Sequence, residues 1–423
     1  MRIRLCAVLA AFIGVWACQG SAPSTGAGAD GGGIEAVGAS RSSSSGGVSG
    51  ASSGSSGGGL SSGGGGSSAS SSGAASRDAS MDVAVSVDAG VNPAPVFSAY
   101  KDTTIAMNWN TNVVSTAVSG SMVALGDDLV RAGGSTVTLA FATGECGAET
   151  WGGVAGDALA SANVSLLGQA SVKYIVSTGG AAGAFTCATD AGMATFLARW
   201  DSLGLVGVDF DIEAGQTQAV IDDLVRRIFA AHALWPALRF SLTLGTLAAN
   251  DGAATAQSLG ASAVDPFNVY GDQSMSAVEA TLGFVAGQPS TWPSYVTINL
   301  MTMDYGAPAM SVCVVASGGC QMGQSALQAA YDLHDRFGVP YVSIELTPMI
   351  GGNDVTSERF TLADADTLAA FALARGLAGV HFWSYDRDVD CPAGAASATC
   401  NTSGAGYAGP HGFLKEFLAG GLR

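Results

Sequence analysis

The stretch Leu205-Val206-Gly207-Val208-Asp209-Phe210-Asp211-Ile212-Glu213 decides the fold, because carboxylates and bulky apolar side chains alternate along it. In an extended strand successive side chains point to opposite faces, so the three acids share one face and Val208, Phe210 and Ile212 share the other. An exposed edge strand of solvated acids would not carry an equally apolar second face. The pattern therefore predicts a buried strand that brings three carboxylates to a functional site.

Short apolar runs alternate with helical runs on both sides of this stretch, from residue 96 onward. Eight strands separated by helices predict a parallel sheet closed into a (β/α)₈ TIM barrel, with a doubly wound open sheet as the alternative. No Gly-x-Gly-x-x-Gly follows the first strand, so a dinucleotide-binding domain is not supported. The expected strands lie near Ala99–Met107, Thr136–Ala142, Val172–Ser177, Val206–Ile212, Arg239–Leu244, Tyr295–Met303, Tyr341–Leu346 and Gly379–Trp383, and the clearest helices near Ala191–Leu203, Gln218–Leu234, Gln324–Phe337 and Asp364–Arg375.

The first quarter of the chain has a different composition from the rest. Residues 1–17 have a basic start and a short apolar core, which predicts a secretory signal peptide. Val15-Trp16-Ala17-Cys18 is similar to a bacterial lipoprotein cleavage box in which Cys18 carries the lipid; ordinary cleavage nearby is the alternative. Residues 18–95 are rich in Gly, Ser and Ala, which predicts a disordered tether before a catalytic barrel at 96–423.

Charge and composition limit the partners that we expect. The 423 residues include 17 basic and 34 acidic ones, and no Lys/Arg cluster occurs, so a nucleic-acid partner is not expected. Neither Cys-x-x-Cys nor matching His spacing is present, so we expect no metal and no cofactor. We expect a secreted or cell-surface monomer whose one membrane attachment would be a lipid on Cys18.

Six cysteines remain after Cys6 and Cys18 are set aside. An even number in an exported domain predicts disulfides, although six cysteines allow fifteen connectivities. Two short separations favour local pairs and leave the first two cysteines for each other. The six are Cys146, Cys187, Cys313, Cys320, Cys391 and Cys400.

The ends of five expected strands carry polar or aromatic residues. In a (β/α)₈ barrel the chemistry gathers where the strands end, so these residues would meet at one site. Glycines within them permit close backbone approach. The endings are Ser177-Thr178-Gly179-Gly180, Asp211-Ile212-Glu213, Met301-Thr302-Met303-Asp304-Tyr305-Gly306, Thr347-Pro348-Met349-Ile350-Gly351-Gly352-Asn353-Asp354 and Phe382-Trp383-Ser384-Tyr385-Asp386-Arg387-Asp388.

Together these endings resemble glycoside hydrolase family 18, the chitinase family. Its strand motif Asp-Gly-x-Asp-x-Asp-x-Glu is matched from Gly207 to Glu213, with Val206 at the first Asp position, and its Ser-x-Gly-Gly strand is matched at 177–180. Residues 301–304 are similar to its Met-x-Tyr-Asp strand, but Met303 stands where the family has Tyr. The Met-Asp-Tyr-Gly at 303–306 is similar to a bacterial subgroup.

The resemblance implies a role for each residue that matches. The implied activity is hydrolysis of chitin or N-acetylglucosamine oligosaccharides, with the substrate's own acetamido oxygen as nucleophile. Glu213 would be the proton donor, Asp211 would orient the acetamido group, and Asp209 would share a proton with Asp211. Tyr305 would substitute for the Tyr missing at Met303. The implied substrate-binding residues are Ser177, Gly179, Met301, Asp304, Tyr305 and Trp383.

Two other functions use the same acidic strand and remain alternatives. One is a non-catalytic chitin- or glycan-binding barrel, and the other is an endo-β-N-acetylglucosaminidase that acts on N-glycans. Retention of Asp211 and Glu213 favours a hydrolase over the binding protein. Trp109 and Trp151, which follow the first two strands, would either extend an aromatic binding track or pack in the core.

Overall fold

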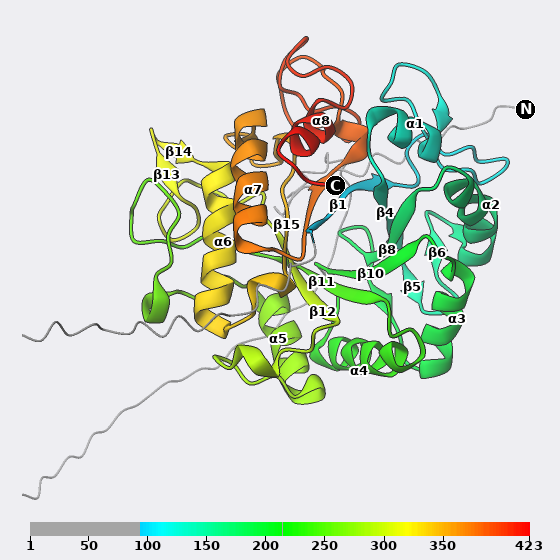
Figure 1. Cartoon of the computed structure of the whole chain (residues 1–423), viewed down its shortest axis with the longest axis horizontal. Helices are drawn as coiled ribbons and strands as arrows, with labels where there is room; N and C mark the ends of the chain where they lie inside the picture. The colour runs from blue at the N-terminus through cyan, green and yellow to red at the C-terminus, as the bar shows by residue number, and fades with distance from the viewer. Residues whose placement is uncertain (1–93, 214) are drawn as a thin grey trace, which may run out of the picture. The chain divides into compact units, whose positions relative to one another are not determined.

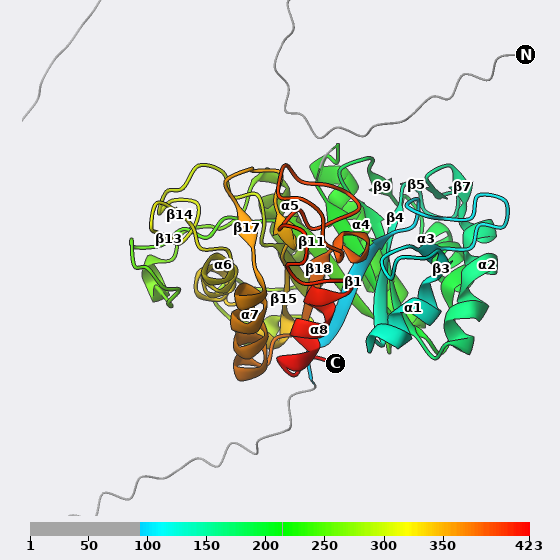
Figure 2. The same cartoon turned by 90° about the horizontal axis from the view of Figure 1, so that it is seen from above.

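The computed structural model describes residues 94–213 and 215–423, which form a closed barrel of eight strands surrounded by helices (Figures 1 and 2). Every neighbouring pair of barrel strands is parallel. The closed sheet confirms the (β/α)₈ prediction and excludes the open sheet. The strands are β1 (Val96–Asp102), β4 (Thr136–Ala142), β8 (Lys173–Gly179), β10 (Leu205–Ile212), β11 (Arg239–Gly245), β12 (Val296–Met301), β15 (Ile344–Thr347) and β18 (Gly379–Trp383).

One α-helix follows each barrel strand along the chain. The last of them, α8, packs on the first strand, with the rings of Phe417 and Phe97 5.3 Å apart, so the two ends of the domain lie side by side (Figure 1). Within the described residues no helix is long and apolar enough to cross a membrane. The helices are α1 (Leu125–Ala132), α2 (Gly156–Gln169), α3 (Asp190–Trp200), α4 (Gln218–Leu234), α5 (Val269–Leu282), α6 (Met322–Phe337), α7 (Leu362–Arg375) and α8 (Gly412–Ala419).

Strand β10 is buried on both faces. Val208, Phe210 and Ile212 are each at most 1% exposed, as are core residues on other strands. Asp209 and Asp211 on the opposite face are 1% and 4% exposed. The alternating stretch is thus a strand that is buried on both sides, as predicted. Its acidic side chains point into the interior of the barrel.

The first strand ends earlier than predicted, at Asp102 instead of Met107. Asp102 Oδ1 accepts hydrogen bonds from the Thr104 backbone N–H at 2.9 Å and from the Thr104 hydroxyl at 2.7 Å. This local turn diverts the backbone from the sheet. The turn places Tyr100 and Asp102 at the end of the strand, which matters for the site.

Polar side chains fill part of the barrel interior below the site. Glu345 accepts a hydrogen bond from Arg239 at 2.6 Å and lies 3.0 Å from His381 Nε2. Burial alone would raise the pKa of Glu345, but the charge of Arg239 and the hydrogen bond with His381 lower it to about 2. His381 also contacts the Ser98 hydroxyl at 2.7 Å. These groups form a hydrogen-bonded core layer, and none of them lines the cleft described below.

Three disulfides tie loops on the side of the barrel where the strands end. Cys146–Cys187 joins the loops that follow β4 and β8, and Cys391–Cys400 closes the loop after β18. Cys313–Cys320 closes the short hairpin of β13 (Val315–Ala316) and β14 (Gly319–Cys320). The pairs are those favoured by the short separations. The predicted signal peptide, Cys18 and the tether to residue 93 lie outside the described residues.

Candidate active site

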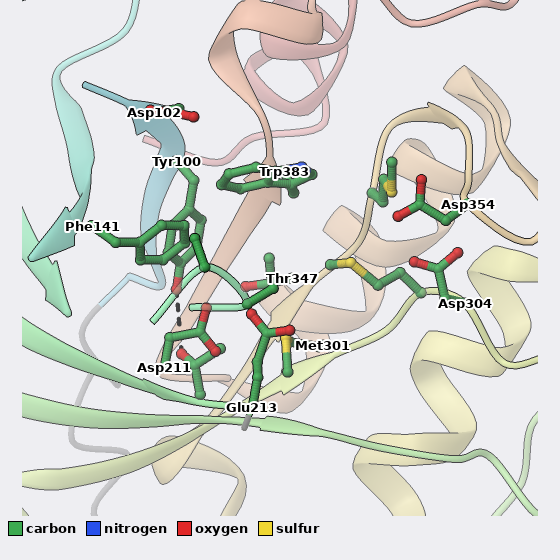
Figure 3. A pocket seen from close by; sticks show the side chains of 15 residues that line it. Tyr100, Asp102, Phe141, Asp211, Glu213, Met301, Asp304, Thr347, Asp354 and Trp383 are labelled. Atoms are coloured by element: carbon green, nitrogen blue, oxygen red, sulfur yellow. Dashed lines mark hydrogen bonds between the residues drawn. The ribbon is translucent and has the colours of Figure 1, made fainter. Parts of the chain in front are cut away.

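An open cleft lies at the carboxyl ends of the barrel strands, where the sequence predicts the site (Figure 3). Each of the eight barrel strands contributes to its walls, either directly or through the loop that follows the strand, so residues far apart in the chain meet here. Five of the lining residues are carboxylates, and none of the lining residues is Lys or Arg. The lining residues are Tyr100, Asp102, Phe141, Ala181, Ala182, Asp211, Glu213, Thr243, Met301, Met303, Asp304, Thr347, Met349, Asp354 and Trp383.

Asp209 lies beneath the cleft and is held by four hydroxyl groups. Oδ2 accepts from Ser177 at 2.6 Å and from Tyr100 at 2.9 Å, whereas Oδ1 accepts from Ser241 and Thr243 at 2.6 Å each. The four donors occupy both oxygens of the Asp209 carboxyl group and fix its orientation. The sharing of a proton between Asp209 and Asp211 stays a prediction, and the four hydroxyl groups are what hold Asp209 in place.

Asp211 and Glu213 lie side by side on the floor of the cleft (Figure 3). Burial, followed by the charges of Glu213 and Asp209, raises the pKa of Asp211 well above its ordinary value. Burial also raises the pKa of Glu213, opposed by hydrogen bonds from Asp211 and the Ala181 N–H. Since both pKa values are raised, the pair retains a proton to higher pH than two isolated carboxyls would. Asp211 Oδ1 is buried and has no protein partner among the described residues.

Gly179 allows β8 to end directly against Asp211. Its φ is +86°, and a Cβ on this residue would lie 2.0 Å from the Asp211 carbonyl oxygen. The next amide, of Gly180, donates to that same oxygen at 3.2 Å. The two glycines thus permit the backbone of β8 to approach the acidic strand, and any side chain at 179 would push Asp211 out of place.

Three aromatic rings form one wall of the cleft. Phe141 and Trp383 stack with ring centroids 5.6 Å apart and an interplanar angle of 23°, and Tyr100 lies 6.3 Å from Trp383 (Figure 3). The Tyr100 hydroxyl is fixed because it donates to Asp209 and accepts from Asn299 Nδ2 at 2.9 Å. An aromatic wall beside a pair of acids is suited to bind the apolar face of a sugar ring.

Two further carboxylates, Asp304 and Asp354, form the facing wall (Figure 3). Asp304 Oδ1 accepts the Val355 backbone N–H at 2.9 Å. Burial raises the pKa of Asp304, the Val355 N–H opposes this, and the charge of Asp354 adds to it. Met301, Met303 and Met349 also line the cleft, so it combines apolar side chains with an acidic wall.

The structure brings most of the predicted residues together at the cleft, but Tyr305 is not among the lining residues. Tyr305 is 4% exposed, its hydroxyl has no partner among the described residues, and it does not line the cleft. Burial, followed by the charges of Glu358 and Asp332, raises its pKa well above the ordinary value. Its placement gives no support to the expected substitution for the Tyr missing at Met303. Ser177, Gly179 and Asp209 lie beneath the cleft, whereas Asp211, Glu213, Met301, Asp304 and Trp383 line it.

Several lining residues are absent from the sequence-based prediction. The sequence analysis expects the first strand to continue to Met107, so it places the end of that strand near Trp109. Tyr100 and Asp102, where the strand in fact ends, are therefore absent from the prediction. The indole of Trp109 is 57% exposed and outside the cleft lining, whereas Trp151 packs in the core with its ring 5.2 Å from Trp200. Phe141 stands at the end of the second strand, and a search of that strand end for aromatic residues would have found it.

Comparisons with known proteins give a likeness of fold. No family model matches the sequence, and no curated protein matches it. The catalytic domain of a hyperthermophilic chitinase from Pyrococcus furiosus matches with a TM-score of 0.54 and 22% identity, over 78% of this chain and 98% of that domain. Catalytic-site mutants of active domain 2 of the thermostable chitinase from the same organism, complexed with chito-oligosaccharides, match with a TM-score of 0.53 and 22% identity, over the same shares of the two chains. At this identity the shared property is the barrel fold.

Proposed function

We propose that this protein is a chitinase-like glycoside hydrolase that cleaves β-1,4-linked N-acetylglucosamine polymers with retention of the anomeric configuration. The observation that carries the proposal is the proton-holding pair Asp211–Glu213 on the cleft floor, above an Asp209 carboxylate held by four hydroxyls. The resemblance of the strand ends to glycoside hydrolase family 18 and the barrel shared with solved chitinase domains support it.

The chemistry assigns one task to each member of the pair. Glu213 donates its proton to the glycosidic oxygen while the acetamido oxygen of the substrate attacks the anomeric carbon, and the glycosidic bond breaks. Asp211, through its free Oδ1, accepts the acetamido N–H and stabilises the positive oxazolinium ion that forms. Water then attacks the anomeric carbon and gives a proton to Glu213, which restores the acid. Two inversions at one carbon give net retention.

The rest of the cleft would bind the sugar chain. Trp383, backed by Phe141, would stack on a sugar ring beside the acids. Asp304 and Asp354 would accept hydrogen bonds from hydroxyl groups of the chain. Five lining carboxylates without a lining Lys or Arg repel anionic polysaccharides, so a polymer of neutral amino sugars fits the cleft better than a uronic acid polymer.

We further propose a secreted or cell-surface protein that acts as a monomer. Three disulfides accord with an oxidising compartment, in which such bonds persist. A lipid on Cys18, if added, would hold the barrel at a cell surface near an insoluble substrate.

The test compares three substrates for the full secreted chain. We expect soluble oligosaccharides from colloidal chitin, no release of glycans from an N-glycosylated protein, and no cleavage of fully deacetylated chitosan, because chitosan lacks the acetamido nucleophile. Binding of chitin without cleavage would instead identify a lectin, and glycan release from the glycoprotein would identify an endo-β-N-acetylglucosaminidase. Equal cleavage of chitosan would contradict the acetamido group as nucleophile and would require a nucleophile from the protein instead.

A further inference from the structure

A buried carboxylate outside the cleft lining, Glu358, holds the loop that carries Asp304. Glu358 is 2% exposed and lies just before β17 (Arg359–Phe360). Its Oε2 accepts the Tyr305 backbone N–H at 3.1 Å and its Oε1 accepts the Gly306 N–H at 2.9 Å. The loop after β12 thus turns its amide groups toward one carboxylate, an arrangement that binds anions in other proteins.

The backbone of this loop adopts a conformation that needs such support. Asp304 has φ +52° and Gly306 has φ +101°, both in the left-handed region. A residue with a Cβ occupies that region at a cost and stays there when its surroundings hold it. The two amides bound by Glu358 immediately follow Asp304, so the Glu358 carboxylate sets the direction in which the Asp304 side chain leaves the backbone.

The contact between the two loops is reciprocal. Asp304 Oδ1 accepts the Val355 N–H at 2.9 Å, and the Asp304 N–H lies 3.4 Å from Asn353 Oδ1. The Glu358 N–H donates to the Val355 carbonyl at 2.8 Å, which closes the second loop on itself. Each loop therefore offers one carboxylate to the amides of the other, and the cleft wall formed by Asp304 and Asp354 is one unit.

We propose that Glu358 is a positioning residue for the cleft: it fixes the loop at 303–306 so that the Asp304 carboxylate faces the Asp211–Glu213 pair. The inference rests on the proposed hydrolase function, because its consequence is read as a change in substrate binding and turnover. Glu358 does not line the cleft.

The electrostatics around Glu358 agree with this role. Burial raises its pKa to about 7, the Gly306 and Tyr305 amides oppose the rise, and the charge of Asp304 adds to it. The charge of Glu358 in turn contributes to the raised pKa of the Tyr305 phenol. The guanidinium of Arg387 is directed elsewhere, to the carbonyl groups of Ile350 and Gly352. Amide dipoles thus provide most of the compensation for the charge of Glu358.

The test is a double-mutant cycle of Glu358→Gln and Asp304→Asn, measured on chito-oligosaccharides. Glutamine keeps the size of the side chain and one acceptor oxygen, so it releases one of the two amides while the fold is retained. We expect about a 10- to 100-fold loss of kcat/KM, the size of effect that a small misplacement of a site residue produces. In the Asp304→Asn background the same change should cost little, because Glu358 acts through Asp304.

Hydrogen exchange supplies a readout that needs no activity. Peptides that contain residues 303–307 should exchange faster in Glu358→Gln than in the wild type, while peptides from β10 should not change. If Glu358→Gln does not fold, Glu358→Asp, which keeps the charge on a shorter side chain, takes its place in the same cycle.

Asp388→Asn is the matched control, because Asp388, although it belongs to the last predicted strand ending, does not line the cleft. Asp388 is a fully buried carboxylate that accepts two backbone amides, those of Phe413 at 2.9 Å and Leu414 at 2.8 Å, and burial raises its pKa to about 7. Its amides belong to α8 and not to the cleft. We expect this variant to lose thermal stability but to keep the wild-type kcat and KM.

Two results would overturn the inference while leaving the proposed function intact. One is unchanged exchange at 303–307 in Glu358→Gln, and the other is a kinetic loss that persists in full in the Asp304→Asn background. A wild-type protein without activity on any chito-oligosaccharide would contradict the proposed function instead. In that case the hydrogen-exchange comparison still decides whether Glu358 holds the loop.

Discussion

At the scale of single residues, Asp209 and Asp211 show how environment separates two identical side chains on one strand face. Asp209 accepts four hydroxyl hydrogen bonds and is held in place beneath the cleft. Asp211, two residues later, keeps one buried oxygen for which the described residues offer no partner, and it has a raised pKa. The unsatisfied oxygen is costly to the fold, and it is the atom that a substrate amide would satisfy.

The first prediction concerns the proton donor. Glu213→Gln keeps the size of the side chain but carries no proton for the leaving oxygen. We expect turnover of chito-oligosaccharides to fall about 10²- to 10⁴-fold, the usual contribution of a general acid. Contacts to Trp383 should survive, so titration calorimetry with the same oligosaccharide should still detect binding. Turnover at the wild-type rate would show that another group is the acid.

The second prediction concerns the pH dependence of kcat. Burial is the main cause of the raised pKa of Glu213, and the charge of Asp304 contributes in the same direction. The acid works only while protonated, so activity falls as pH rises through this pKa. Asp304→Asn removes one negative charge, which lowers the pKa and should move the alkaline limb of the kcat profile to lower pH. A limb that stays in place or moves to higher pH would contradict the assignment.

At the scale of elements, the loops after the barrel strands build the cleft and the disulfides hold some of them. Cys146–Cys187 spans 41 residues and joins two loops, whereas Cys313–Cys320 spans 7 residues within one hairpin. The loops at 303–306 and 353–358 are held without a disulfide, by carboxylates and amides. A disulfide also restrains the unfolded chain, whereas the hydrogen bonds between carboxylates and amides act in the native state alone.

The third prediction compares the disulfides as loop closures. Because a longer loop loses more entropy on closure, replacing both Cys146 and Cys187 by Ser should lower the free energy of unfolding by about 4 kcal/mol, against about 2 kcal/mol for the pair at 313 and 320. Urea denaturation of the two double variants measures the difference. An equal loss, or a larger one for the hairpin, would show that local contacts outweigh loop entropy.

At the scale of the whole molecule, the domain buries several carboxyl groups whose folded-state pKa values are raised. Burial is the largest cause of the raised pKa in each case, and few of these groups face a cation that would lower it. The ordinary values are 3.8 for Asp and 4.5 for Glu. The pKa values are about 7 for Asp332, Glu358 and Asp388, and about 6 for Asp386, which Lys101 partly compensates.

The fourth prediction is a thermal stability that falls as pH rises from about 4.5 to about 7. In this window the unfolded chain has lost these protons while the native state keeps them, so raising the pH favours unfolding. Glu345, with a pKa of about 2, acts in the opposite sense, but its contribution is lost only below its ordinary value of 4.5. Scanning calorimetry across the window should give the highest Tm near its acidic end. A Tm that rises steadily to pH 7 would contradict the prediction.

The sequence by itself determined the features that depend on local pattern and on connection rules. Period-two alternation identified β10 and the face of its acids, and eight alternating strands and helices leave few topologies other than a closed barrel. The rule that chemistry gathers at strand ends then placed Asp211, Glu213, Asp304 and Trp383 together, as the cleft shows.

Only the tertiary structure decided which side chains of the loops face the cleft. A turn at Asp102 ends β1 early and places Tyr100 in the site. In the loop after β12, Glu358 binds the backbone amides of Tyr305 and Gly306, while the Asp304 side chain faces the cleft and Tyr305 is buried. The contacts of Glu358 join residues about fifty positions apart, whereas the turn at Asp102 is a local contact that the helix and strand patterns do not reveal. A loop has no period in its sequence, so its conformation follows from the partners that its amides find in the folded chain.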